Sequence, residues 1–184
     1  GMSSAASDVY KRQVVGVVLT GNGRAFIAGA DISEFGGNVE GVSLNEVFQK
    51  LEHCSKPVVA AINGIALGGG LETALCCNYR IADKNAFVGL PEVNLGLLPG
   101  GGGTQRLPRL AGPSEALKMM LTGLHVPAKK ALDMGIIDGI SNDVVNESIG
   151  FIKNKAESNE DHPKVRDLNS CLLYTSDAAD DIPR

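Results

Sequence analysis

Apolar residues gather along the chain in short runs that predict buried strands. Residues 14–20 and 58–62 are continuous apolar or β-branched runs, and each ends at a turn of glycine and asparagine. Residues 79–82 and 86–88 are shorter extended pieces. The run at 14–20 is closed by the glycine turn and is interpreted as a buried strand, and the run at 58–62 is the second clear strand.

Between these strands, apolar residues recur at helical spacing. Ser43 and Glu46 form a capping-box pattern, which opens a predicted helix to about Cys54. Three further helices are predicted. One begins after Gly70, and one runs from its cap at Ser114 to about Leu121. The third covers residues 128–134 and ends at Gly135. Residues 136–138 then return to the core, and residues 154–167 are a polar linker or an exposed helix end. Strands alternate with helices, so the predicted class is α/β.

Composition changes this picture little. The 184 residues fit one domain, 43% of them are apolar, and the net charge of −4 gives no electrostatic case for nucleic acid or an anionic membrane. No run reaches the roughly 18 apolar residues of a membrane span. The cysteines lack metal-type spacing, which favours reduced thiols and a cytoplasmic location of bacterial type, with a peroxisomal or mitochondrial one left open. They are Cys54, Cys76, Cys77 and Cys171.

The two ends of the chain are related through their coding DNA. Residues 3–13 can be back-translated into a DNA whose reverse complement encodes residues 171–180. Unrelated segments should not share one DNA in this way, and the sequence resembles a transposon-end adapter used in sequencing libraries. We therefore expect residues 1–13 and 171–184 to be non-native tails, which do not belong in fold reasoning. Residues 14–170 are then the natural part, open at both ends.

The most informative chemical feature is a pair of glutamates, Glu72 and Glu92, each close to a glycine-rich turn. Two carboxylates beside exposed backbone N–H groups can share proton transfer while the amides hold a developing oxyanion. Taken singly, Glu72 would be a solvated residue on a helix and Glu92 a surface-loop charge. The glycine clusters at 68–70 and 100–103 lack G-x-G-x-x-G spacing and a P-loop lysine. What they leave is a helix N-terminus with unpaired N–H groups.

Three linked sequence motifs stand in a fixed order: residues 26–32, residues 63–72, and residues 89–92 with Gly96, Pro99, Gly102, Gly103, Thr104 and Gln105. In this order they resemble the enoyl-CoA hydratase/isomerase (crotonase) superfamily. Residues 128–138 fit as well. The Gly-Leu-Pro-Glu-Val motif at 89–93 and residues 165–168 are most similar to the hydratase part of multifunctional fatty-acid β-oxidation enzymes.

This resemblance implies roles for individual residues. The N–H groups of Ala30 and Gly69 would form the oxyanion hole for a thioester carbonyl. Glu72 and Glu92 match the two catalytic glutamates of the family, with Glu92 favoured as the proton donor. The implied contacts to coenzyme A and substrate are Arg24, Ala28, Asp31, Ile32, Gly68, Pro91 and Gly100. The resemblance implies no metal and no redox cofactor, and coenzyme A counts as part of the substrate.

The resemblance also implies a fold and an activity. We expect a spiral of repeated β-β-α units, truncated at both ends, because the opening strands and C-terminal helices of the family are absent. The strands at 14–20 and 58–62 should lie near each other, with Gly69 at a helix N-terminus. The expected activity of the parent is addition of water to trans-2-enoyl-CoA, while this chain should be weakly active or inactive and should self-associate. The alternatives are a Δ3-Δ2 enoyl-CoA isomerase, which can work with one acid at Glu92, and a non-catalytic acyl-CoA binding module.

Overall fold

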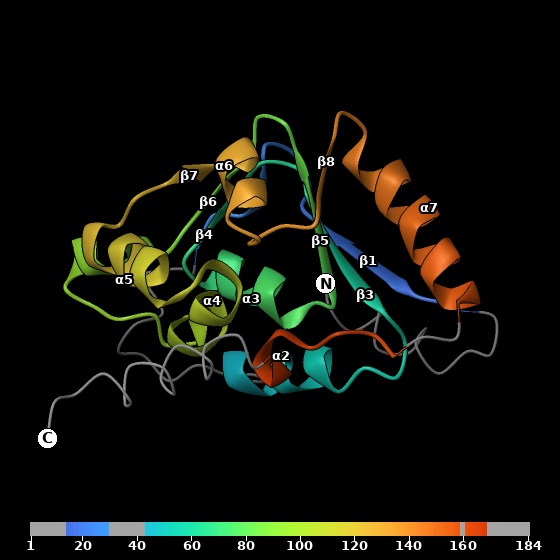
Figure 1. The fold of residues 1–184 in the computed structure, drawn as a ribbon, viewed down its shortest axis with the longest axis horizontal. Helices are drawn as coiled ribbons and strands as arrows, with labels where there is room; N and C mark the ends of the chain where they lie inside the picture. The colour runs from blue at the N-terminus through green and yellow to red at the C-terminus, as the bar shows by residue number, and fades with distance from the viewer. Residues whose placement is uncertain (1–13, 30–42, 159–160, 169–184) are drawn as a thin grey trace, which may run out of the picture.

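The computed structural model describes residues 14–29, 43–158 and 161–168, and its strands form two four-stranded sheets (Figure 1). The predicted tails, residues 1–13 and 171–184, lie outside the described residues. The first sheet has the order β1-β3-β5-β8, and all its pairs are parallel. Its strands are β1 (Val17–Thr20), β3 (Val58–Ile62), β5 (Tyr79–Asp83) and β8 (Gly139–Ser141). Pairing of β1 with β3 confirms that the two strongest apolar runs lie side by side.

The second sheet has the order β2-β4-β6-β7, in which only the last pair is antiparallel. Its strands are β2 (Ala25–Ile27), β4 (Ile65–Leu67), β6 (Phe87–Gly89) and β7 (Val126–Pro127). In β3-β4-α3 and in β5-β6-η2-α4, a strand of the first sheet is followed by one of the second and then by a helix, and β1 and β2 have the same strand order, which confirms the predicted β-β-α units. The helices are α2 (Leu44–Glu52), α3 (Gly69–Cys76), α4 (Gly103–Ala111), α5 (Pro113–Thr122), α6 (Ala128–Asp133) and α7 (Val144–Glu157), with 3-10 turns η2 (Pro91–Leu95) and η3 (Val165–Asp167).

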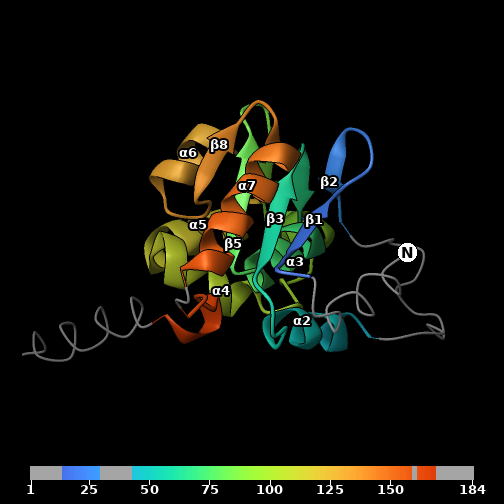
Figure 2. The same cartoon turned by 90° about the vertical axis from the view of Figure 1, so that its right-hand side faces the viewer.

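Strand β3 is covered on both faces, which accounts for its continuous apolar run. Val58, Ala60 and Ile62 belong to the large core that includes α3, whereas Val59 and Ala61 belong to a smaller cluster with α7. Figure 2 shows α7 lying across β3 and β5 on the side of the sheet away from α3. The first sheet therefore has α7 on one face and α3 on the other, and α3 also packs against β2 and β4 of the second sheet and against α2 and α4.

The helix signals in the sequence have different outcomes. The side chain of Ser43 accepts a hydrogen bond from the N–H of Glu46, which confirms the predicted cap of α2. The predicted cap at Ser114 is wrong. Helix α5 begins at Pro113. The residue before it is Gly112, which has a φ of 79° and provides no side-chain cap. Proline suits the first helical position because it has no N–H to satisfy there, and this places Ser114 inside the helix.

The burial of two isoleucines and two cysteines agrees with what the sequence predicts for them. Ile136 and Ile137 are buried, which confirms that the segment after α6 returns to the core. Cys76 and Cys77 are packing residues, and burial raises the pKa of each thiol to about 12. None of the described helices is both long enough and apolar enough to cross a bilayer.

Candidate functional site

A cavity of about 350 Å³ brings together segments that lie far apart in the sequence. Its walls come from the end of β2, the junction of β4 with α3, the turn η2 and the loop that precedes α4. The lining residues are Ala28, Gly29, Leu44, Leu67, Gly68, Gly69, Glu72, Pro91, Glu92, Leu95, Leu97, Leu98, Gly100 and Gly101.

The junction of β4 with α3 is formed by Gly68 and Gly69. Gly68 has φ 54° and ψ −125°, a conformation that residues with a side chain rarely adopt, and its N–H donates to Gly89 O at 2.9 Å. A Cβ on Gly68 would lie 3.3 Å from Glu92 Oε1. Helix α3 starts at Gly69, which confirms the predicted helix N-terminus. The first N–H groups of a helix have no partner within it, so this end favours an oxygen that becomes negative.

Glu72 lies in the first turn of α3 and is 2% exposed. Its Oε1 accepts hydrogen bonds from the N–H groups of Gly101 and Gly103, both at 2.8 Å. The loop leaves no room for side chains there, because a Cβ on Gly101 would lie 2.9 Å from the Glu72 Cδ. Glu72 is therefore not a solvated charge on a helix surface. Two backbone donors fix its carboxylate at the wall of the cavity.

Glu92, in η2, has a different environment. Its Oε2 is buried and has no hydrogen-bond partner among the residues that the structure describes. Burial raises the pKa of Glu92, a hydrogen bond from the backbone N–H of Glu92 to its own carboxylate partly offsets this effect, and the charge of Glu72 raises the pKa further. The environment of Glu92 therefore favours retention of a proton. Perturbed carboxyls in a cavity are a common mark of functional sites.

The structure gathers most of the predicted site residues. Glu72, Glu92 and Gly69 line the cavity, as do the predicted contact residues Ala28, Gly68, Pro91 and Gly100. Arg24 does not line it and is exposed in the turn between β1 and β2. Ala30, Asp31 and Ile32 lie outside the described residues.

Sequence reasoning missed the apolar wall of the cavity. Leu44 comes from α2 and Leu67 from β4, while Leu95, Leu97 and Leu98 come from η2 and the loop that follows it. The last three are also largely exposed, although leucines usually favour burial. The closely spaced leucines after Glu92 were the available signal. In the described part of the chain, no group of three His, Cys, Asp or Glu side chains is arranged to hold a metal ion.

A family model described as enoyl-CoA hydratase/isomerase matches residues 5–169. The chain belongs to this family. It is 51% identical over 140 residues to the peroxisomal bifunctional enzyme of Danio rerio, covering 76% of this chain and 19% of that protein. It is 54% identical over 142 residues to the fatty acid oxidation complex subunit alpha of Shewanella loihica, and this match covers 72% of this chain and 20% of that protein. The chain thus spans about a fifth of the length of these relatives.

Solved structures of the family share the fold. An enoyl-CoA hydratase from Bacillus anthracis superposes with a TM-score of 0.76 at 38% sequence identity, and the match covers 86% of this chain and 65% of that one. The predicted crotonase-like fold is therefore confirmed. The similarity to the two longer fatty-acid oxidation proteins also confirms the closer resemblance to multifunctional enzymes.

Proposed function

We propose that residues 14–170 carry the site of an enoyl-CoA hydratase, which adds water to a trans-2-enoyl-CoA thioester in fatty-acid β-oxidation. The observation that carries the proposal is the presence of Glu72 and Glu92 on one cavity, beside the helix N-terminus at Gly69. Membership of the enoyl-CoA hydratase/isomerase family supports it. The apolar wall of leucines supports an acyl chain as the part of the substrate that enters the cavity.

In this proposal the thioester carbonyl accepts hydrogen bonds from the N–H of Gly69 and, by the family motif, from that of Ala30. Each such donor contributes roughly 3 kcal/mol to stabilising the developing oxyanion. Polarisation of the carbonyl makes C3 electrophilic, and a water oxygen forms a bond to C3. Glu72, held by two backbone N–H groups, orients this water and accepts its proton.

The addition is completed at C2. As the new C–O bond forms, the electrons of the C2–C3 double bond move toward the thioester oxygen, and the resulting enolate takes a proton at C2. The raised pKa of Glu92 supports its assignment as the donor of this proton. Return of the water proton from Glu72 to Glu92 restores both carboxyl groups for the next turnover, so the proposed chemistry needs no metal or redox cofactor.

We propose further that coenzyme A approaches along the segment that holds Ala28, Asp31 and Ile32, beside Gly68, Pro91 and Gly100. Arg24 is exposed, so it would meet a phosphate of the ligand outside the cavity. A cytoplasmic location is supported by the three thiols Cys54, Cys76 and Cys77, which are free in the described residues.

The test compares this chain with its Glu92→Gln variant on a short trans-2-enoyl-CoA, at high protein concentration because we expect weak turnover. The variant should lose turnover by about two orders of magnitude or more while binding of the CoA thioester stays measurable. Equal turnover by both proteins would refute the role of Glu92. Parallel incubation with a 3-enoyl-CoA separates hydration from double-bond isomerisation. Binding of the thioester without any turnover, in a protein with both ends restored, would instead favour the binding-module alternative.

A further inference from the structure

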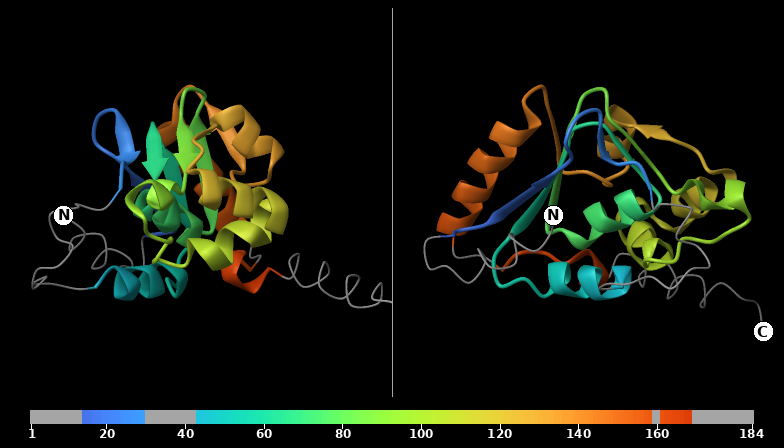
Figure 3. Two further views of the ribbon diagram at one scale, coloured as in Figure 1. Left: turned by 90° about the vertical axis from the view of Figure 1, so that its left-hand side faces the viewer. Right: turned by 180° about the vertical axis from the view of Figure 1, so that it is seen from behind.

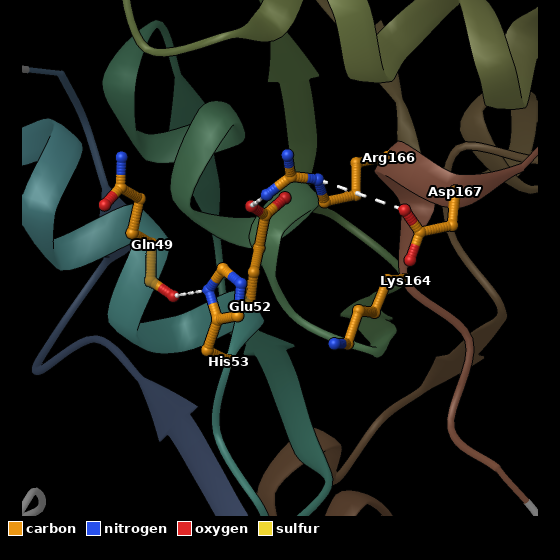
Figure 4. Close-up of a pocket in the computed structure, with 6 residues that line it drawn as sticks. All are labelled: Gln49, Glu52, His53, Lys164, Arg166 and Asp167. Atoms are coloured by element: carbon orange, nitrogen blue, oxygen red, sulfur yellow. Dashed lines mark hydrogen bonds and ion pairs between the residues drawn. The ribbon is translucent and has the colours of Figure 1, made fainter.

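A second cavity, of about 410 Å³, contains an ion-pair network that the proposed chemistry does not use (Figure 4). It lies between α2 and the segment around η3 and is lined by Gln49, Glu52, His53, Lys164, Arg166 and Asp167. Glu52, the last residue of α2, is the buried charge among them, with a side chain only 3% exposed. A buried carboxylate is costly unless charged partners and hydrogen bonds compensate it.

Two arginines from different elements provide this compensation. Arg106 of α4 donates from Nε to Glu52 Oε1 at 2.7 Å, and Arg166 of η3 donates from Nη1 to Glu52 Oε2 at 3.0 Å. The Arg106 side chain is 11% exposed, whereas that of Arg166 is 49% exposed. The inner pair with Arg106 is therefore the less screened of the two.

Arg106 links Glu52 to the loop that holds Glu72. Its Nη1 donates to the carbonyl oxygen of Gly101 at 2.7 Å, and the N–H of Gly101 donates to Glu72 Oε1 at 2.8 Å. The guanidinium also occupies the space beside Gly102, where a Cβ would collide with Nη1. The φ of 92° at Gly102 requires glycine as well. A continuous path thus connects Glu52 through Arg106 and Gly101 to the carboxylate on the cavity wall.

The guanidinium remains charged in this position. Burial lowers the pKa of Arg106, but the hydrogen bond to Glu52 and the neighbouring negative groups outweigh this effect, so that its pKa is raised. A planar guanidinium can hold two acceptors at a fixed angle, which a lysine ammonium cannot do. Arg106 therefore sets the orientation of the Gly101 peptide relative to the end of α2.

We propose that Glu52 and Arg106 are positioning residues, which hold the loop of residues 100–103 and thereby fix the carboxylate of Glu72. The consequence for turnover rests on the proposed hydratase function, whereas the consequence for the loop does not. A shift of about 1 Å in a catalytic group can cost roughly 100-fold in rate, so a loosened loop should lower kcat rather than thioester affinity.

The experiment uses Arg106→Lys and Glu52→Gln in this chain, with Lys129→Met as the matched control. Lys129 forms an exposed ion pair with Asp133, so the control also removes an ion pair, but one outside both cavities. Hydration of a short trans-2-enoyl-CoA gives kcat and KM. Hydrogen exchange of the Gly101 and Gly103 amides, measured by NMR, reports on the loop independently of activity.

We expect both variants to lower kcat roughly 10- to 100-fold with KM changed by less than about threefold. The Gly101 and Gly103 amides should exchange faster while the amides of β3 keep their protection, and the control should match the original chain in every reading. Wild-type kcat together with unchanged exchange at both glycines in Arg106→Lys would overturn the proposal. If the amides of Arg106→Lys lose protection throughout the protein, that variant is destabilised as a whole. In that case kcat and the exchange of the Gly101 and Gly103 amides in Glu52→Gln test the proposal.

The two proposals can fail separately. If the chain does not hydrate the substrate even with both of its ends restored, the proposed function fails, and the exchange of the Gly101 and Gly103 amides in the original chain still tests the positioning role. If the original chain is active and neither kcat nor exchange responds to the variants, only the positioning role fails.

Discussion

Glycine is required at Gly101 and Gly103 because the carboxylate of Glu72 occupies the space that side chains would need. A Cβ on Gly103 would lie 3.0 Å from Glu72 Oε1, and one on Gly101 would lie 2.9 Å from Glu72 Cδ and closer still to the ring of Phe48. Both glycines also donate their N–H groups to this carboxylate. Close approach of backbone to a charged group is therefore what these glycines provide.

Gly101→Ala should consequently displace the Glu72 carboxylate. We expect a loss of turnover of roughly 10- to 100-fold and a destabilisation of about 1–3 kcal/mol from overpacking. The measurements are hydration of a trans-2-enoyl-CoA and urea unfolding. Gly150→Ala is the matched control, since Gly150 is exposed in α7 with no atom within 4 Å of an added Cβ. It should leave turnover unchanged and stabilise the protein by about 0.5–1 kcal/mol. Equal effects of the two substitutions would argue against steric control of Glu72.

The raised pKa of Glu92 leads to a prediction for stability against pH. Burial, followed by the charge of Glu72, raises this pKa above its ordinary value of 4.5. The folded protein then holds the proton over a range in which the unfolded chain has released it. Stability therefore falls as pH rises from about 4.5 through the pKa of the folded state, and the penalty is complete above it. Glu92→Gln removes this penalty.

As pH rises through that window, Glu92→Gln should accordingly become more stable relative to the original chain, which means that the difference in the free energy of unfolding between the two proteins should increase. Urea unfolding at several pH values between about 4 and 7 measures the difference. A difference that stays constant with pH would mean that the folded environment does not disfavour ionisation of Glu92.

Among the elements, strand β3 was the most predictable because burial on both faces leaves a continuous apolar run, whereas β1 is only partly buried. The bounds of β3 match the prediction at 58–62, and β1 is three residues shorter at its start. Helix α4 was missed because it starts in a glycine run and contains Pro108, two features that usually argue against a helix. Strands β7 and β8, of two and three residues, are too short for a periodic pattern and depend on pairing with β6 and β5.

The same distinction applies to the candidate site. Glu72, Glu92 and Gly69 were predicted because each stands in a local motif of glycines. The leucine wall and the network of Glu52 with Arg106 could not be found in this way. They join α2, η2 and α4, so only the tertiary arrangement makes neighbours of residues more than fifty positions apart.

Buried Arg80 provides a test of how β5 is joined to the segment before β8. Its guanidinium donates to Asp138 Oδ2 at 3.1 Å and to the carbonyls of Ile136 and Cys77 at 2.9 Å. The N–H of Arg80 also donates to Asp138 Oδ2, at 2.7 Å. Asp138→Ala leaves a buried charge with fewer partners and should destabilise the protein by about 2 kcal/mol.

Asp133→Ala is the control for this prediction, because it removes a carboxylate from an exposed ion pair with Lys129. It should change the free energy of unfolding by about 0.5 kcal/mol or less. Thermal or urea unfolding of the two variants gives the comparison. If Asp138→Ala is as mild as Asp133→Ala, the Arg80 network does not hold β5 to the segment before β8.

For the whole molecule, the distribution of exposed leucines is uneven. Leu95, Leu97 and Leu98 follow Glu92, and Leu117 and Leu121 lie four residues apart on α5, with Leu98 76% and Leu121 61% exposed. The turn η2 packs against α5, so these leucines belong to one region of the fold. Figures 1 and 3 show that α5 and α7 lie at opposite ends of the molecule. Grouped apolar surface of this kind often marks an interface.

We therefore expect the chain to self-associate through the face that contains α5. Burying apolar surface contributes about 25 cal/mol per Å², so several leucines covered together can support association of two copies. The double variant Leu117→Glu with Leu121→Glu should shift the protein toward monomer, since charges in a buried apolar contact are strongly unfavourable. Val145→Glu is the control, because Val145 is an exposed apolar residue of α7. Sedimentation equilibrium at several concentrations measures the association. A monomeric original chain, or an equal effect of Val145→Glu, would show that this leucine surface is not the contact between copies.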